Sequence, residues 1–249
     1  MSGKGKLLRK AAILAFWLVL WQVLAIIVHN KVVIVGPLET LSALIAMLPT
    51  AAFWRAVSGS VLRITAGFCA GSVCGVLLAW AAYILPLLRE VLSPFISALK
   101  AVPVASFVIL LLIWAGSSML SFFITFVVVL PILYLNTLEG LLAADKRLLE
   151  LASVYRMGFS SRLRGIYFPQ LRPHLTASAE LAAGMAWKSG VAAEVIGQPV
   201  GSLGNELYRS KIYLETDRLL AVTAVAILLS WLLGRLLLLL LRGGKQGRR

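Results

Sequence analysis

The sequence contains few of the residue types from which catalytic and metal sites are usually built. Its 249 residues include two histidines, two cysteines and ten acidic residues, and only 14% of the chain is charged. Cys69 and Cys74 lie in one apolar stretch, where thiols are usually buried hydrophobes, so we predict neither a disulfide framework nor a metal site. The motifs GxxxxGK[ST], HExxH, CxxC and GxSxG are absent. We therefore do not expect an enzyme, and any ATP hydrolysis must come from another polypeptide.

Long apolar runs take the place of these groups, since 60% of the residues are hydrophobic. A helix needs about 20 apolar residues to cross a hydrocarbon core of roughly 30 Å. The runs are continuous rather than alternating, which favours helices over a β-barrel. We predict an all-α polytopic membrane protein with six transmembrane helices, at about residues 11–28, 57–85, 92–115, 120–138, 175–196 and 219–241.

The distribution of basic residues predicts the orientation. Four lie within residues 1–10, six within 139–173 and four within 242–249, and cytoplasmic segments near span ends carry such an excess. We expect these three segments to be cytoplasmic, with the first helix and an external loop at 11–56 and a transmembrane core at 57–241. The net charge of +14 then reflects topology and membrane lipid, and nucleic acid is not an expected partner.

Two further segments have predicted places in this topology. The first span resembles a signal peptide, but its length and the following His29-Asn30-Lys31 favour a retained anchor. Residues 197–217 contain Pro199, Gly201 and Gly204, followed by polar residues. We expect an external loop with a short interfacial helix there.

A stripe of small residues marks the second span, where Gly67, Gly71 and Gly75 recur at four-residue intervals. Such a stripe lets another helix approach closely, so we predict a helix-packing face. Whether the partner helix belongs to this chain or to a second copy stays open.

Charged residues within spans are costly and therefore informative. Lys188 and Glu194 lie in the fifth span, and each is a candidate either for the substrate pathway or for a contact with neighbouring helices. Arg63, near the outer end of the second span, is expected to extend its charge toward the membrane surface.

The charged segment 139–173 interrupts the apolar sequence. Leucines alternate with charged residues between Leu141 and Leu151 at spacings typical of an amphipathic helix, and Gly158 can end that helix in the left-handed conformation. A second short helix is predicted from Ser161 to Phe168, before Pro169. From its pattern alone, this segment fits a surface-lying element and a docking element equally well.

The same segment resembles a known motif. Glu150, Ala152, Ile166 and Pro169 are in register with E-A-A-x3-G-x9-I-x-L-P, the EAA motif of inner-membrane permeases of ATP-binding-cassette importers. Residues 100–116, 136–152 and 186–197 are similar to the nitrate, sulfonate and taurine branch of that family. The sequence departs from the motif at Leu151, which replaces the second alanine, and at Arg156, which occupies the glycine position, with Gly158 two residues later.

The resemblance implies a type I importer fold, with this chain as the permease in the cell inner membrane. It implies a second permease copy, an external substrate-binding protein, and separate ATPase subunits that bind the ATP and Mg²⁺. The solute would be a small one, such as the anions nitrate, sulfonate or taurine. The segment 139–173 would hold the coupling helix that contacts the ATPase, through Glu150, Leu151, Ala152, Val154, Tyr155, Arg156, Met157, Gly158, Ile166 and Pro169.

Two alternatives remain open at this point. The chain could be the transmembrane scaffold of an energy-coupling-factor transporter, which also docks ATPases through cytoplasmic helices. It could also be a secondary transporter, although its halves show no clear repeat and no paired broken helices.

Overall fold

The computed structural model describes residues 3–30 and 32–242, and all regular structure within them is helical. The elements are α1 (Gly3–Val28), α2 (Pro37–Met47), α3 (Ala51–Ile84), α4 (Pro86–Ala101), α5 (Val104–Ala115), α6 (Leu120–Leu142), α7 (Lys146–Val154), α8 (Phe159–Arg162), a π-helical turn η1 (Leu163–Tyr167), α9 (Phe168–Gly197), α10 (Leu203–Ile212) and α11 (Thr216–Arg242). The all-α prediction is therefore confirmed.

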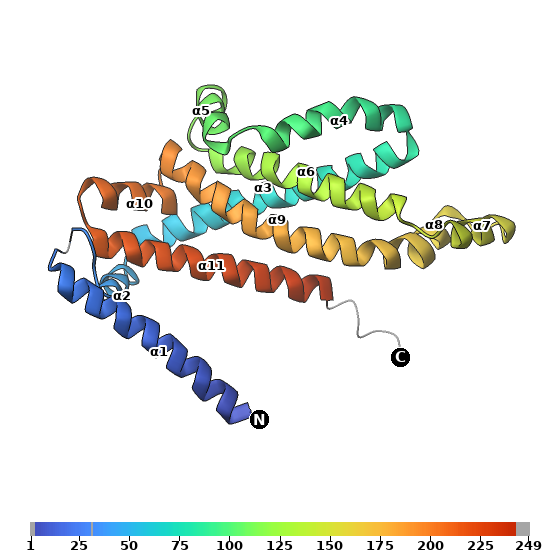
Figure 1. Cartoon of the computed structure of the whole chain (residues 1–249). Coiled ribbons are helices and arrows are strands. Elements are labelled where there is room, and N and C mark those ends of the chain that lie inside the picture. The colour runs from blue at the N-terminus through green and yellow to red at the C-terminus, as the bar shows by residue number, and fades with distance from the viewer. Residues whose placement is uncertain (1–2, 31, 243–249) are drawn as a thin grey trace.

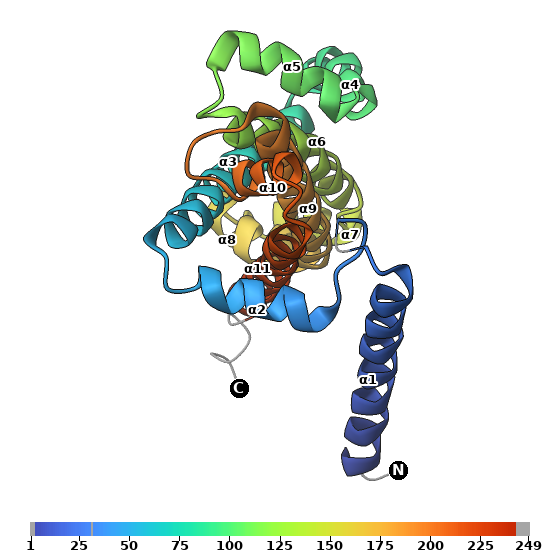
Figure 2. The same cartoon turned by 90° about the vertical axis from the view of Figure 1, so that its left-hand side faces the viewer.

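Three long helices, α3, α6 and α9, form the centre of the molecule and share its most extensive contacts. Figure 1 shows them side by side, with α4 and α5 on one side and α11 and α2 on the other. Helix α1 stands apart from this bundle in Figure 2, and no residue of its apolar stretch Leu8–Val28 is buried. The core that positions the polar groups is thus the α3–α6–α9 layer.

The glycine stripe of α3 lies against α6. A Cβ atom at Gly67 would meet the carbonyl oxygen of Phe122 in α6, and one at Gly71 would lie 2.9 Å from that of Phe126. At Gly75 the corresponding distance, to the carbonyl oxygen of Leu130, is 2.7 Å. Because glycine has no Cβ, the two backbones approach at a separation that other residues would not allow.

The predicted third span, 92–115, is not one straight helix. It is divided between α4 and α5, which are bent by 102° at the break. Val102 is extended, with ψ 125°, because a residue that precedes proline is disfavoured in the helical region. Pro103 then caps α5. The predicted span is thus a bent pair of helices rather than one straight helix, and the break gives α4 and α5 separate directions.

The number of helices long and apolar enough to cross a membrane is four in the described residues, or five with the bent pair α4–α5. The prediction of six exceeds this number because α9 does not qualify. Helix α9 has 30 residues, enough at about 1.5 Å per residue to cross a bilayer, but it is less apolar. It packs mainly against α6 and also contacts α3, α10 and α11, and Ser178, Ser189 and Glu194 are its buried polar residues.

Segment 197–217 contains the predicted short helix, which is α10. The Ser202 hydroxyl caps it by accepting a hydrogen bond from the Asn205 backbone N–H at 3.0 Å. Helix α10 packs on α9 and α11 at the end of the bundle where α3 begins. This arrangement brings the loop before α10 against the charged residues of α3 and α9.

Candidate functional site

The segment between α6 and α9 forms a knob, which we define as residues 143–167. It comprises α7, α8 and η1, and Figure 1 shows it projecting beyond one end of the three central helices. The Asp145 carboxylate caps α7 by accepting a hydrogen bond from the Arg147 backbone N–H at 2.9 Å. The knob is therefore a folded element with defined helices.

The turn after α7 is made by Arg156, which has a left-handed conformation with φ 50°. The Met157 N–H donates to the Ala152 carbonyl at 2.9 Å, and the Arg156 N–H donates to the Ser153 carbonyl at 3.0 Å. These two bonds define a Schellman motif, which usually has glycine at the position of Arg156. Gly158 is extended, with φ −62° and ψ 158°, and precedes α8. The prediction that the left-handed turn moves to Gly158 was therefore wrong.

Arg162 stabilises this turn from the next helix. Its Nε donates to the Met157 carbonyl at 2.9 Å, and its Nη2 donates to the Ala152 carbonyl at 3.3 Å. Hydrogen bonds from a charged donor are stronger than those between neutral groups. They help to hold a conformation that is unfavourable for arginine at position 156. The sequence analysis did not single out Arg162, because it is not part of the motif.

Substitution Arg156→Gly is expected to stabilise the turn by up to about 1 kcal/mol, because glycine adopts the left-handed conformation without a Cβ penalty. Hydrogen exchange at the amides of residues 152–158 should then slow by up to about fivefold. Gly158→Ala is the matched control: its φ is negative, and no heavy atom lies within 4 Å of an added Cβ. Faster exchange in Arg156→Gly would contradict the assignment of the turn.

The chain leaves the knob through η1 without a break. The predicted separate helix Ser161–Phe168 is not present, because α8 ends at Arg162 and η1 leads directly into α9. Pro169 does not end a helix but lies in the first turn of α9. Proline lacks the N–H that donates within a helix and crowds the preceding turn, and a π-helical turn is one way in which a helix accommodates such a disturbance.

Three aromatic residues connect η1 to α3. The Tyr167 ring packs edge-on against Trp80 and Tyr83, at centroid distances of 5.3 and 6.0 Å. The two tyrosine hydroxyls are hydrogen-bonded at 3.2 Å. Burial and the hydrogen bond with Tyr83 raise the pKa of Tyr167 to about 12. A movement of the knob can thus reach α9 through the chain and α3 through Tyr167.

The motif residues of the knob include both buried and exposed side chains. Ala152 and Ile166 are buried, whereas Leu151, Val154 and Tyr155 are 52%, 76% and 77% exposed. Met157 is half-buried, and Glu150, Arg156, Gly158 and Pro169 are exposed. Phe159, which the sequence analysis did not name, extends the exposed apolar surface. We call Leu151, Val154, Tyr155 and Phe159 the apolar tip of the knob.

A buried ion cluster lies at the opposite end of the bundle. Its centre is Glu194 of α9, which is completely buried and forms an ion pair with Arg63 of α3 at 3.2 Å. The hydroxyls of Ser60 and Ser121 donate to the Glu194 carboxylate at 2.5 and 3.2 Å. The Gly204 N–H of α10 donates to it at 3.4 Å. One carboxylate thus joins α3, α6, α9 and α10.

Arg63 also fixes the loop before α10, since its Nη2 donates to the Gly201 carbonyl at 3.0 Å. The expectation that Arg63 extends toward the membrane surface was wrong, because Glu194 holds it inside. Lys188 does not join this cluster and is exposed on α9. Sequence reasoning missed the pairing because Arg63 and Glu194 are 131 residues apart, and no spacing rule connects them.

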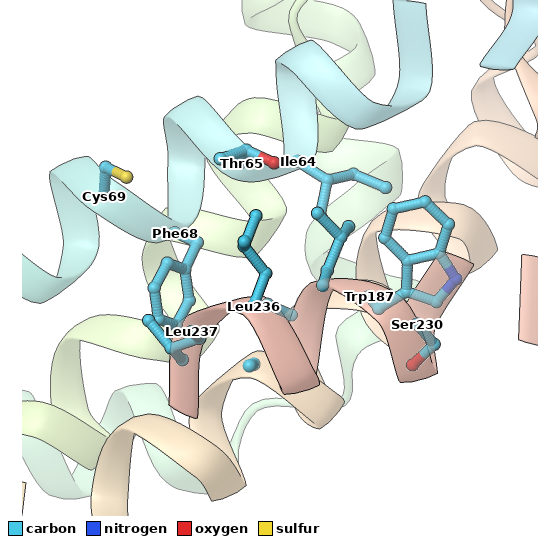
Figure 3. Close-up of a pocket in the computed structure, with 11 residues that line it drawn as sticks. Ile64, Thr65, Phe68, Cys69, Trp187, Ser230, Leu236 and Leu237 are labelled. Atoms are coloured by element: carbon cyan, nitrogen blue, oxygen red, sulfur yellow. The ribbon is translucent and has the colours of Figure 1, made fainter. Parts of the chain in front are cut away.

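An apolar cavity of about 170 Å³ lies between α3, α9 and α11 (Figure 3). Its apolar lining includes Phe68, Leu236 and Leu237. Its polar groups are the side chains of Thr65, Cys69 and Ser230 and the indole of Trp187. It has no charged side chain and is unsuited to an ion. In the described part of the chain, no three His, Cys, Asp or Glu residues could share a metal ion.

Long apolar helices, a buried ion pair and a projecting knob define a polytopic helical membrane protein. Residues 71–243 match the family described as the inner membrane component of binding-protein-dependent transport systems. The chain belongs to this family, and is accordingly the multi-pass permease component of an ATP-binding-cassette importer rather than a catalytic subunit. Such a system includes an ATPase and a binding protein. This membership favours the importer over both alternatives.

Curated relatives are distant. The chain is 25% identical over 164 residues to SsuC, a permease protein assigned to aliphatic sulfonate transport in Bacillus subtilis, covering 65% of this chain and 59% of that protein. It is 23% identical to the taurine transport system permease protein TauC of Escherichia coli, covering 90% and 82%. It is 24% identical to the bicarbonate transport system permease protein CmpB of Synechococcus elongatus, covering 73% and 69%. The match spans less than two thirds of SsuC.

Proposed function

We propose that this permease transports a small anion, and that it acts as one of two copies that enclose the pathway. The relatives named above are permeases for sulfonate, taurine and bicarbonate, which all carry an anionic group. Lys188 is the pathway candidate on α9, since it is exposed and available to a solute. Glu194 is inaccessible in this conformation, and we assign it to helix packing through its ion cluster.

We further propose that the knob is the coupling element for the ATPase. The observation that carries this proposal is the apolar tip, four large apolar side chains left exposed on a folded projection outside the bundle. Exposed apolar patches on projecting elements commonly mark interaction sites. Glu150 and Arg156 are exposed beside the tip and would orient the partner at the rim of the contact.

The proposed orientation places the knob and both termini in the cytoplasm. This orientation rests on the excess of lysine and arginine in segments 1–10, 139–173 and 242–249. In this orientation the ion cluster and α10 lie toward the side of the binding protein. ATP-driven displacement of the knob would then pass through η1 to α9 and through Tyr167 to α3 as a rigid-body movement.

Substitution Tyr155→Glu is expected to abolish most ATP-driven uptake, because it buries a charge in an apolar interface. We expect uptake by the reconstituted complex to fall at least about tenfold, with the ATPase dissociating from the permease during purification. Leu8→Glu is the control, since Leu8 is 76% exposed and lies on α1, distant from the knob. Normal uptake and retained ATPase in Tyr155→Glu would reject the knob as the coupling element.

A further inference from the structure

A groove between α4 and α6 is lined by charged and hydroxyl side chains. Its volume is about 250 Å³. The polar residues that line it are Arg89, Ser93, Ser97 and Lys100 from α4, and Tyr134 and Glu139 from α6. None of them belongs to the knob or to the ion cluster.

The polar residues of α4 form one face. Successive members of the set are separated by four, four and three residues, which brings them to the same side of the helix. They are Arg89, Ser93, Ser97 and Lys100. Ile96 lies on that side too, is 2% exposed and packs in a cluster with Leu130 and Tyr134. The buried isoleucine holds this face against α6, so the hydroxyls and cations border the groove.

Lys100 and Arg89 lie toward opposite ends of α4, and both side chains are exposed on the surface of the single chain. Helix α4 begins near the knob end and runs back along α6 (Figure 1). Lys100 is 11 residues after Arg89, which at about 1.5 Å per residue places it roughly 16 Å farther from that end. Ionisable residues at membrane depth usually face a water-filled cavity or a pathway. Lys100 lies within the predicted span 92–115, but the sequence analysis did not select it.

The cations of the groove have no protein partner in the described part of the chain. The ion pairs found there are Arg63–Glu194 and Arg218–Glu215. Glu139 is therefore beyond 4.0 Å of both Arg89 and Lys100, and the groove has an excess of one positive charge. The Tyr134 residue is 2% exposed, and its hydroxyl has no hydrogen-bond partner among the described side chains. Cations and hydroxyls without partners suit a small oxyanion.

We propose that this groove is a subsite for the transported anion. Lys100 and Arg89 attract a sulfonate or carboxylate group, and the hydroxyls of Ser93, Ser97 and Tyr134 donate hydrogen bonds to its oxygens. Glu139 opposes a purely anionic solute and limits how tightly it binds. This inference rests on the proposed function, because it assigns a place in the chain to the small anion named there.

The test uses the full complex of permease, ATPase and binding protein in phosphatidylcholine vesicles. Uptake of taurine, methanesulfonate and bicarbonate identifies which of these probes the wild type accumulates. For that probe, Lys100→Gln should lower kcat/KM at least about tenfold, because it removes a charge-assisted contact. Lys100→Arg should retain most of the activity. Glu139→Gln, in the same groove, should have the opposite effect to Lys100→Gln and raise kcat/KM.

ATP hydrolysis stimulated by the loaded binding protein should stay near the wild-type rate in Lys100→Gln, which shows that the complex is folded and docked. Lys10→Gln, on the exposed face of α1, removes the same charge elsewhere and should leave uptake unchanged. Unaltered uptake in both Lys100→Gln and Arg89→Gln would overturn the subsite and leave the importer intact. A wild type that accumulates none of the probes would instead overturn the proposed function.

A parallel set of vesicles containing phosphatidylglycerol separates the anion from a lipid headgroup. If the groove binds the transported anion, the loss in Lys100→Gln is equal in both kinds of vesicle. If wild-type uptake requires phosphatidylglycerol and the variant does not respond to it, the groove binds a lipid phosphate, and the assignment to the transported anion is overturned.

Discussion

Substitution Glu194→Ala is expected to lower the free energy of unfolding of the permease by about 3–5 kcal/mol, the usual effect of removing one member of a buried ion pair. The loss is large because four groups lose their acceptor together. The Arg63 guanidinium stays charged in a side chain that is only 19% exposed, and it loses its carboxylate partner. The Ser60 and Ser121 hydroxyls and the Gly204 N–H each lose their acceptor. Thermal unfolding of the detergent-solubilised chain measures the change.

Another ion pair, found among the described residues, provides the control for Glu194→Ala. Arg218 and Glu215 lie 3.0 Å apart, but their side chains are 45% and 41% exposed. Arg218→Ala should therefore cost no more than about 1 kcal/mol. The double variant Arg63→Met, Glu194→Gln should be less destabilised than the sum of its single variants, because no unpaired charge remains buried. Strictly additive losses would show that the ion pair does not stabilise the bundle.

The second large effect is expected for Gly71→Ala, whose methyl group would lie 2.9 Å from the carbonyl oxygen of Phe126 and 3.1 Å from the Cβ of Val129. Helices α3 and α6 must separate to accommodate it, at a cost of about 1–3 kcal/mol. A leucine at this position should prevent assembly of the bundle. The yield of folded, detergent-solubilised protein and its thermal unfolding measure both effects.

Gly184→Ala on α9 is the comparison for Gly71→Ala, because no heavy atom lies within 4 Å of a Cβ built there. Alanine is favoured over glycine inside a helix by about 0.5–1 kcal/mol. The same substitution should thus stabilise the protein at residue 184 and destabilise it at residue 71. Stabilisation at both positions would indicate that α3 and α6 can move apart without loss.

Local sequence signals predicted the main elements and failed where two segments interact. Apolar run length predicted one span at residues 92–115, but not that α4 and α5 would meet there at 102°. The glycine preference of left-handed turns placed the turn after α7 at Gly158. The structure places it at Arg156, where the hydrogen bonds from Arg162 offset the unfavourable conformation. Tertiary contacts therefore overrode a correct statistical preference.

The candidate sites also differ in whether local sequence signals could locate them. The knob could be located from the motif residues Glu150, Ala152, Ile166 and Pro169, since they are close in sequence. The ion cluster could not, because its members come from four elements and Arg63 and Glu194 are 131 residues apart. The groove with Lys100 also required knowledge of which helix lies beside α4.

The sequence by itself determined the class of protein, its all-helical fold, its family and the place of the charged segment 139–173 in the chain, because apolar run length, charge distribution and a short motif are properties of the chain alone. Only the tertiary structure decided that Arg63 pairs with Glu194, that the glycine stripe of α3 faces α6, and that Arg89 and Lys100 share a groove with Tyr134. These contacts depend on how helices distant in sequence pack, and packing is fixed by the fit of whole surfaces rather than by any local pattern.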